Sequence, residues 1–157
     1  MREIANLNQH ERLMGKISRS FGRGHDVIFH GTRYATQVLR SGKLLPNSSN
    51  GSAICFTRSP ETAAYFALLQ GGPPDGFFGA VLVLNRRTLS QQYRLEPFHS
   101  CDWDENEYSR DEREERIWGR TVNFRRHLIG AVTEADCERH FLSQMKPEGQ
   151  SLGHACG

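Results

Sequence analysis

Apolar residues fall into short blocks along the chain, and glycine, proline and polar residues separate these blocks. The unbroken apolar run at 79–84 predicts a strand that is buried on both faces. Shorter apolar runs with turn-forming residues at their ends predict further strands, at 27–30, 53–57, 93–96 and 128–132. The pattern therefore indicates a sheet that is built from several short strands.

Helical patterns flank these strands. Residues 1–20 place apolar side chains at helical spacings, which predicts an amphipathic helix that is broken at Gly22. The tripeptide Ser-Pro-Glu at 59–61 is typical of a helix start, because serine caps the helix and proline suits its first position. Two more helices are predicted, at 34–41 and 133–144, whereas 85–88 is predicted to be a turn.

This order of elements predicts an α+β fold, with few helices and with those helices outside the strand-rich second half. The chain of 157 residues is long enough for one domain with its own core. Because no repeat or linker divides it, we expect a single domain over residues 1–145. The polar, glycine-containing residues 146–157 are expected to form a flexible tail.

Charge is distributed unevenly although the net charge is only +2. Residues 102–115 carry eight of the eighteen acidic residues and two basic residues, which leaves ten acids against eighteen bases elsewhere. Such a run is usually a solvated segment. It also offers a functional carboxylate on an otherwise basic body that tolerates anions.

Several classes of protein and site are not expected. No apolar run approaches the ~20 residues that span a bilayer, and residues 1–21 lack the apolar core of a signal peptide, so we expect a cytoplasmic protein without a membrane partner. The cysteines form no CxxC pair, and His99, Cys101 and Asp102 lack a second ligand cluster, so no metal is expected. The motifs GxSxG, GxxxxGK[ST] and HExxH are missing.

Two motifs carry the candidate chemistry. His30, Gly31 and Thr32 close the first short strand, and Cys55 lies in the second strand, ten residues before Tyr65 on the next predicted helix. This order resembles the ADP-ribosyltransferase superfamily, in the His-Tyr-Glu branch that diphtheria-like toxins share with the poly(ADP-ribose) polymerases. There, a strand ends in His-Gly-Ser/Thr, and a tyrosine follows on the helix after the second strand.

The resemblance covers roughly residues 27–132 and implies a split pair of antiparallel sheets with NAD across the gap and helices at the periphery. It implies cleavage of the bond between nicotinamide and ribose through an oxocarbenium-like transition state. In this arrangement His30 hydrogen-bonds a ribose hydroxyl, and the backbone of Gly31 pairs with the nicotinamide carboxamide. Thr32 bonds the same ribose or caps the following helix, and Tyr65 stacks on the nicotinamide ring.

Three further residues belong to the expected NAD site. Cys55 departs from the family pattern, because it stands where these proteins place a second aromatic ring. Without a basic neighbour in sequence it is expected to be a small apolar filler rather than a nucleophile. Arg33 and Arg58 directly follow the two motifs, and either can meet the pyrophosphate of NAD as a charged donor.

The resemblance also implies a catalytic glutamate at the start of a late strand. Glu114 and Glu115 are the candidates, and on a strand they point to opposite faces. Glu114 is preferred, because Arg116 then shares its face and Ile117 packs on the other. Glu115 remains open as an alternative, and Glu112 is a candidate auxiliary acid that orients an acceptor. A solvated helix over the whole run is the structural alternative.

The sequence thus predicts an enzyme, a small mono-ADP-ribosyltransferase that uses NAD and transfers ADP-ribose to a macromolecule. A protein side chain is preferred over a nucleic-acid base as acceptor, and the pattern is typical of phage-encoded or toxin-like effectors acting in a host cytoplasm. Two alternatives stay open. One is an RNA 2′-phosphotransferase that uses the same NAD cleft, and the other is a non-catalytic module that binds NAD, ADP-ribose or a partner. The oligomeric state is not predicted.

Overall fold

The computed structural model describes residues 7–48, 51–69, 79–98 and 114–144. It has a six-stranded antiparallel sheet in the order β5-β6-β3-β1-β4-β8 and a separate two-stranded sheet of β2 and β7. The strands are β1 (Val27–Thr32), β2 (Lys43–Leu44), β3 (Ala53–Thr57), β4 (Ala80–Asn85), β5 (Glu96–Pro97), β6 (Glu114–Trp118), β7 (Val122–Asn123) and β8 (Leu128–Thr133). The helices are α1 (Gln9–Phe21), α2 (Ala35–Ser41), α3 (Pro60–Ala67), α4 (Arg86–Gln92), the 3-10 helix η3 (Arg125–His127) and α6 (Glu134–Gln144).

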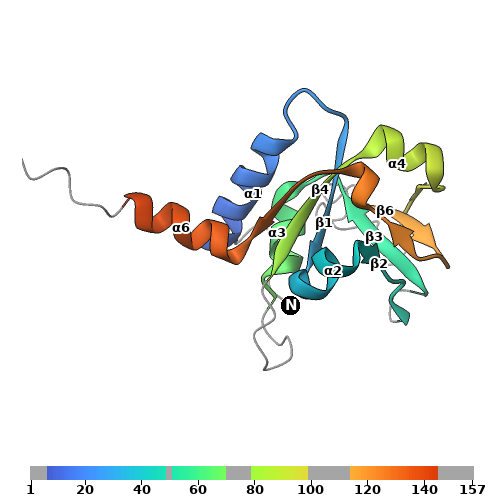
Figure 1. Cartoon of the computed structure of the whole chain (residues 1–157), viewed down its shortest axis with the longest axis horizontal. Helices are drawn as coiled ribbons and strands as arrows, with labels where there is room; N and C mark the ends of the chain where they lie inside the picture. The colour runs from blue at the N-terminus through green and yellow to red at the C-terminus, as the bar shows by residue number, and fades with distance from the viewer. Residues whose placement is uncertain (1–6, 49–50, 70–78, 99–113, 145–157) are drawn as a thin grey trace, which may run out of the picture.

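The large sheet is covered on both faces (Figure 1). Helices α1, α3 and α6 cover one face, where the buried core includes Met14, Phe29, Ala64, Val81, Val83 and Val132. Helices α2 and α4 and the small sheet cover the other face, where the core includes Ile28, Leu44, Phe56, Leu82, Leu89, Ile117 and Phe124. The α+β class expected from the sequence is confirmed, as one six-stranded sheet with a small second sheet.

Strand β4 lies inside the large sheet, between β1 and β8. Val81 and Val83 face the α1 side, and Leu82 and Leu84 face the α4 side, so both faces of the strand are fully buried. The continuous apolar run at this place predicted such a strand, and the structure confirms it.

Local sequence signals set the starts of three helices. Asn8 and Glu11 form a capping box at α1, in which the Glu11 amide donates to the Asn8 Oδ1 at 2.8 Å. The Ser59 hydroxyl accepts from the Thr62 amide at 3.2 Å, which caps α3 as its Ser-Pro-Glu start predicted. Asn85 caps α4 in the same manner.

Three sequence-based expectations are wrong. Residues 86–88 begin α4 rather than a turn, because the Asn85 side chain caps a helix in which Leu89 alone is buried. The strand predicted at 93–96 is reduced to β5, because Tyr93 turns its ring into the core and accepts a hydrogen bond from the Asn123 amide at 2.9 Å. The second half of the chain is therefore not poor in helices, since α4 and α6 both lie there.

Other expectations are confirmed or fall outside the described ranges. The strands at 27–30, 53–57 and 128–132 and the helices at 34–41 and 133–144 agree with the structure to within two residues at their ends. None of the helices in the described part of the chain is both long and apolar enough to cross a bilayer. The proposed tail, the acidic residues up to 113 and the possible ligands His99, Cys101 and Asp102 lie outside the described residues.

Candidate functional site

Strand β1 is paired very differently along its two edges. With β4 it forms an antiparallel ladder over six residue pairs, from Val27↔Asn85 to Thr32↔Ala80. With β3 it pairs only at Phe29↔Thr57. The two strands therefore separate beyond this pair, and we call the region between β1 residues 30–32 and β3 residues 54–56 the seam.

His30 is the first residue of β1 beyond the last pair with β3, and its imidazole bridges the seam. Its Nδ1 lies 2.7 Å from the carbonyl oxygen of Cys55, and its ring centroid lies 5.6 Å from that of Phe56. Because a carbonyl only accepts, Nδ1 must carry the proton and donate it. The hydrogen bond fixes both the tautomer and the orientation of the ring.

The electrostatic state of His30 follows from its surroundings. Desolvation lowers the pKa of the imidazole below its ordinary value, and the hydrogen bond to the Cys55 carbonyl opposes this only in part. The ring is therefore neutral at pH 7, with a lone pair on Nε2. Nε2 has no hydrogen-bond partner among the described residues. It can accept a hydrogen bond from a hydroxyl group of a ligand.

Gly31 and Thr32 have clear structural roles. A Cβ atom on Gly31 would lie 2.0 Å from the carbonyl oxygen of Ala63, so α3 can approach β1 only because this residue is glycine. The Thr32 hydroxyl accepts from the Tyr34 amide at 3.1 Å, just before α2. The predicted helix cap is wrong, because α2 has no side-chain cap hydrogen bond and the Thr32 hydroxyl closes a turn ahead of the helix, while ribose binding stays a prediction.

Tyr65 and Cys55 lie on the α3 side of the sheet. Tyr65 is buried on α3, and its ring meets that of Phe66 edge-on at a centroid distance of 5.3 Å. Strand alternation puts the side chain of Cys55 on the opposite face of β3 from the core residues Ile54 and Phe56. Cys55 is partly exposed and forms no disulfide with the described residues, and its carbonyl accepts the hydrogen bond from His30.

The two candidate glutamates take opposite faces of β6, as predicted. Glu115 pairs with Phe56 and lies on the α4 face, whereas Glu114 pairs with Thr57 and lies on the other face. The solvated-helix alternative is wrong for the described part of this run, since residues 114–118 form a strand within the sheet. The two carboxylates also differ in their exposure and in the charges around them.

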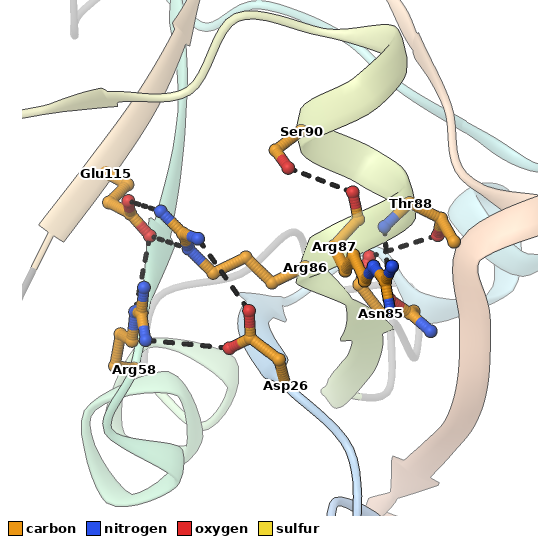
Figure 2. A network of polar contacts seen from close by, with 8 residues as sticks. All are labelled: Asp26, Arg58, Asn85, Arg86, Arg87, Thr88, Ser90 and Glu115. Carbon is orange, nitrogen blue, oxygen red and sulfur yellow. Dashed lines mark hydrogen bonds and ion pairs between the residues drawn. The ribbon is translucent and has the colours of Figure 1, made fainter.

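Glu115 is fully engaged in a network of ion pairs (Figure 2). Arg86 donates to it from Nε at 2.9 Å and from a terminal nitrogen at 2.6 Å, so the contact is bidentate. The Arg58 Nε lies 3.5 Å from the same carboxylate, and Asp26 meets both guanidinium groups at 3.6 and 3.8 Å. The network joins the beginnings of β1, α4 and β6 to the end of β3.

The network sets the charge state of Glu115. The hydrogen bonds from Arg86 hold the pKa of this carboxyl below its ordinary value, although burial acts in the opposite direction. The same contact raises the pKa of Arg86. Glu115 is therefore ionised, and the two arginines balance its charge. Its side chain is only 9 % exposed, so its role is structural.

Glu114 lies in a more open environment. Its side chain is 21 % exposed, and one carboxylate oxygen lies 3.1 Å from the Nε of Arg116. The guanidinium of Arg116 stacks on Phe98, 3.3 Å from the ring centroid, and lies 5.5 Å from the ring of Trp118. Glu114 Oε2 has no hydrogen-bond partner among the described residues.

Cys55 connects the histidine to the acidic strand. Its carbonyl accepts a hydrogen bond from His30 on β1. On the other side of β3 it is paired with Arg116 of β6, and the Arg116 Nε donates a hydrogen bond to Glu114. By alternation along the strands His30 shares the face of Phe56 and Glu115, but its ring is turned toward the β3 backbone at the seam. The histidine and Glu114 thus lie on two strands that are separated by β3 alone. By alternation they lie on opposite faces of the sheet, so one ligand reaches both only if it passes through the seam.

The two candidate arginines differ. Arg58 is committed to Glu115 and Asp26, so a role at a pyrophosphate would require it to leave this network. Arg33 forms no ion pair with any residue in the described parts of the chain, and it follows the seam directly. The auxiliary acid Glu112 lies outside the described residues.

Sequence reasoning missed the partners of both glutamates. The sequence predicted a turn at Arg86, and no sequence pattern links this residue to Glu115, which lies 29 residues away. The stacking of Arg116 on Phe98 and near Trp118 was also missed, although the alternation within β6 brings Arg116 and Trp118 to one face. Asn85 is a typical helix-capping residue, and it was the one sequence signal for α4. A helix predicted to begin after Asn85 would have placed Arg86 in its first turn.

Comparison of the chain with protein-family models, curated proteins and solved structures found no match. The resemblance to ADP-ribosyltransferases therefore rests on the sequence motifs at residues 30–32, 55 and 65.

Proposed function

We propose that the chain is an NAD-dependent ADP-ribosyltransferase that holds NAD across the seam. The single observation that carries the proposal is the state of His30. A desolvated, neutral imidazole has its Nδ1 fixed on the Cys55 carbonyl and its Nε2 without a partner among the described residues, where the ladder between β1 and β3 ends. Such a group is suited to bind a sugar hydroxyl rather than a proton.

In the proposed reaction the bond between ribose C1′ and the nicotinamide nitrogen breaks, and nicotinamide leaves with the bonding electrons. The ribose becomes cationic, as in other glycosyl transfers. A nucleophile of the acceptor then forms a bond to C1′ and releases its proton to solvent. His30 positions the sugar, and Arg33 is the described cation best placed to meet the pyrophosphate.

We assign the stabilising carboxylate to Glu114. A positive charge that develops on the ribose needs a nearby anion that is not already neutralised. Glu115 fails this requirement, because two guanidinium groups surround it. Glu114 keeps one oxygen without a described partner, and Arg116 orients the other. Tyr65, which is only 9 % exposed, is proposed to contact the nicotinamide ring.

The test is release of nicotinamide from NAD and transfer of label from NAD to acceptors in a cell lysate. We expect both activities for the wild-type chain and loss of both for Glu114→Gln. His30→Ala should raise KM for NAD, whereas Arg139→Ala, a change on the distant helix α6, serves as the control. If the wild-type chain neither releases nicotinamide nor labels any acceptor, the proposed function is wrong.

A non-catalytic NAD-binding module is the second candidate, and Cys55 favours it. The family pattern places an aromatic ring here, and the cysteine cannot enclose nicotinamide between two rings. Calorimetry separates the candidates, because a binding module should bind NAD without turnover and should keep that affinity in Glu114→Gln.

A further inference from the structure

Two segments of the chain contain no acidic residue at all. They are residues 27–60 and 116–133, and together they contain eight arginine and lysine residues. The small sheet brings the two segments together, because β2 pairs with β7 at Lys43↔Asn123 and Leu44↔Val122. The molecule therefore has a cationic side that its net charge of +2 conceals.

Six of these cations are exposed; Arg58 is ion-paired, and the other five lie in β2 or within three residues of β2 or β7. We call them the basic surface, which consists of Arg40, Lys43, Arg120, Arg125 and Arg126. None of the five forms an ion pair with a carboxylate anywhere in the described ranges. Unpaired cations that are grouped on one side attract a polyanion, and the attraction is a sum over several phosphates or carboxylates.

The protein holds parts of this surface in place. Arg125 donates to the Arg40 carbonyl at 2.6 Å, which ties η3 to the end of α2. Arg120 lies over the ring of Tyr93 at 5.1 Å. Cations that are fixed in this manner lose less conformational entropy when a ligand binds.

An exposed aromatic ring lies close in sequence to one cation of the basic surface. Trp118 is the last residue of β6, two positions before Arg120, and it is 41 % exposed. One edge of its ring lies against Gly51, where an added Cβ atom would come within 3.2 Å of the indole, and the ring lies 6.4 Å from that of Phe98. A supported but exposed indole offers a π-face on which a nucleobase can stack.

We propose that the acceptor is a single-stranded nucleic acid, with its phosphates on the basic surface and one base on Trp118. The combination of a cationic path with a stacking ring is typical of single-strand binding and is not needed for an acidic protein. Trp118 also shares a face of β6 with Glu114, so a base that stacks on Trp118 lies on the same face of this strand as the proposed catalytic carboxylate. The proposal rests on the proposed function only in calling the strand an acceptor, and it departs from the protein acceptor expected from the sequence.

Binding is tested first without NAD, by fluorescence anisotropy of a labelled single-stranded oligonucleotide of about 12 nucleotides. The double variant Lys43→Glu/Arg126→Glu should weaken binding at least tenfold and reduce the salt slope of log K by about 1.4, because each lost phosphate contact removes about 0.7. Trp118→Ala should weaken binding about 5- to 100-fold and leave the salt slope unchanged.

The matched control is Arg12→Glu/Lys16→Glu on α1, which makes the same change in net charge at exposed positions outside the basic surface. Binding that falls equally in both double variants would overturn the proposal, since only total charge would then matter. Equal affinity for a duplex or for poly-glutamate, with no effect of Trp118→Ala, would also overturn it and would assign the surface to another polyanion.

Adding NAD separates this inference from the proposed function. Oligonucleotide binding without NAD cleavage would retain the surface and contradict the enzyme. NAD cleavage without oligonucleotide binding would retain the enzyme and contradict the nucleic-acid acceptor. Both proposals together predict transfer of ADP-ribose to the oligonucleotide, with the loss of transfer in Trp118→Ala exceeding the loss of nicotinamide release.

Discussion

The two faces of β6 place neighbouring glutamates in opposite situations. On the α4 face, Glu115 is nearly buried and is neutralised by Arg86 and Arg58. On the other face, Glu114 is more exposed and meets one guanidinium, which is itself stacked on Phe98. The difference teaches that an acidic residue in a candidate site is better judged by the charges around it than by its place in a motif.

The largest expected effect is on catalysis at the open face. Glu114→Gln keeps the shape of the side chain and removes its charge, so turnover should fall by about 10²–10³-fold, as for other groups that stabilise charge in a transition state. Nicotinamide release measures turnover, and thermal unfolding should be nearly unchanged. A Glu114→Gln variant with normal turnover would remove the catalytic distinction between the two faces.

The next effect is on stability at the closed face. Glu115→Ala removes the nearer of the two carboxylates that Arg86 and Arg58 share, so the free energy of unfolding should fall by about 3 kcal/mol. Denaturant unfolding measures the loss. In Glu115→Leu/Arg86→Met the buried pair is replaced as a unit, and most of the lost stability should return. A loss below about 0.5 kcal/mol for Glu115→Ala would show that the network is not structural.

The free energy of unfolding should depend on pH through Glu115 and through two histidines. The pKa of Glu115 is held below its ordinary value of 4.5, so its stabilisation is present above that pH and is lost as the pH falls through the folded-state pKa. Glu115→Gln should lack this acid limb. His30 and His127 have lowered pKa values, so the unfolded chain binds more protons and stability already falls below their ordinary value of 6.5. Urea unfolding at a series of pH values checks both windows.

The smallest expected effect is at the start of α4. Asn85 caps the helix whose first residue is Arg86, through a 3.1 Å hydrogen bond from the Thr88 amide. Asn85→Ala should cost about 1 kcal/mol of unfolding free energy and leave nicotinamide release unchanged. Asn85→Asp provides the control, because it retains the cap. A loss of turnover in Asn85→Ala would show that the closed face also controls the chemistry.

Sequence alone predicted the features of the fold that local patterns determine. The cap at Ser59, the strand 53–57 and the buried run at β4 follow from neighbouring residues, and the structure agrees. Helix α4 was missed because only Leu89 on it is buried, which leaves no apolar repeat to detect. The shortness of β5 was missed because Tyr93 finds its hydrogen-bond partner far along the chain.

The candidate site shows the same limit. Alternation along a strand was enough to put Glu114 and Glu115 on opposite faces from the sequence alone. It could not show that Arg86 and Arg58 neutralise one of them, because these contacts join residues that are distant in sequence. It also could not show that the imidazole of His30 lies at the place where two strands separate.

The central claim is that His30 Nε2 and Glu114 meet one sugar across the seam. A crystal structure of Glu114→Gln, which should bind NAD without cleaving it, tests this claim most directly. The account predicts a ribose hydroxyl at about 3 Å from Nε2, with the substituted side chain at position 114 beside the same ribose and Cys55 between the two. NAD bound elsewhere on the molecule, or a ribose that reaches neither side chain, would contradict it.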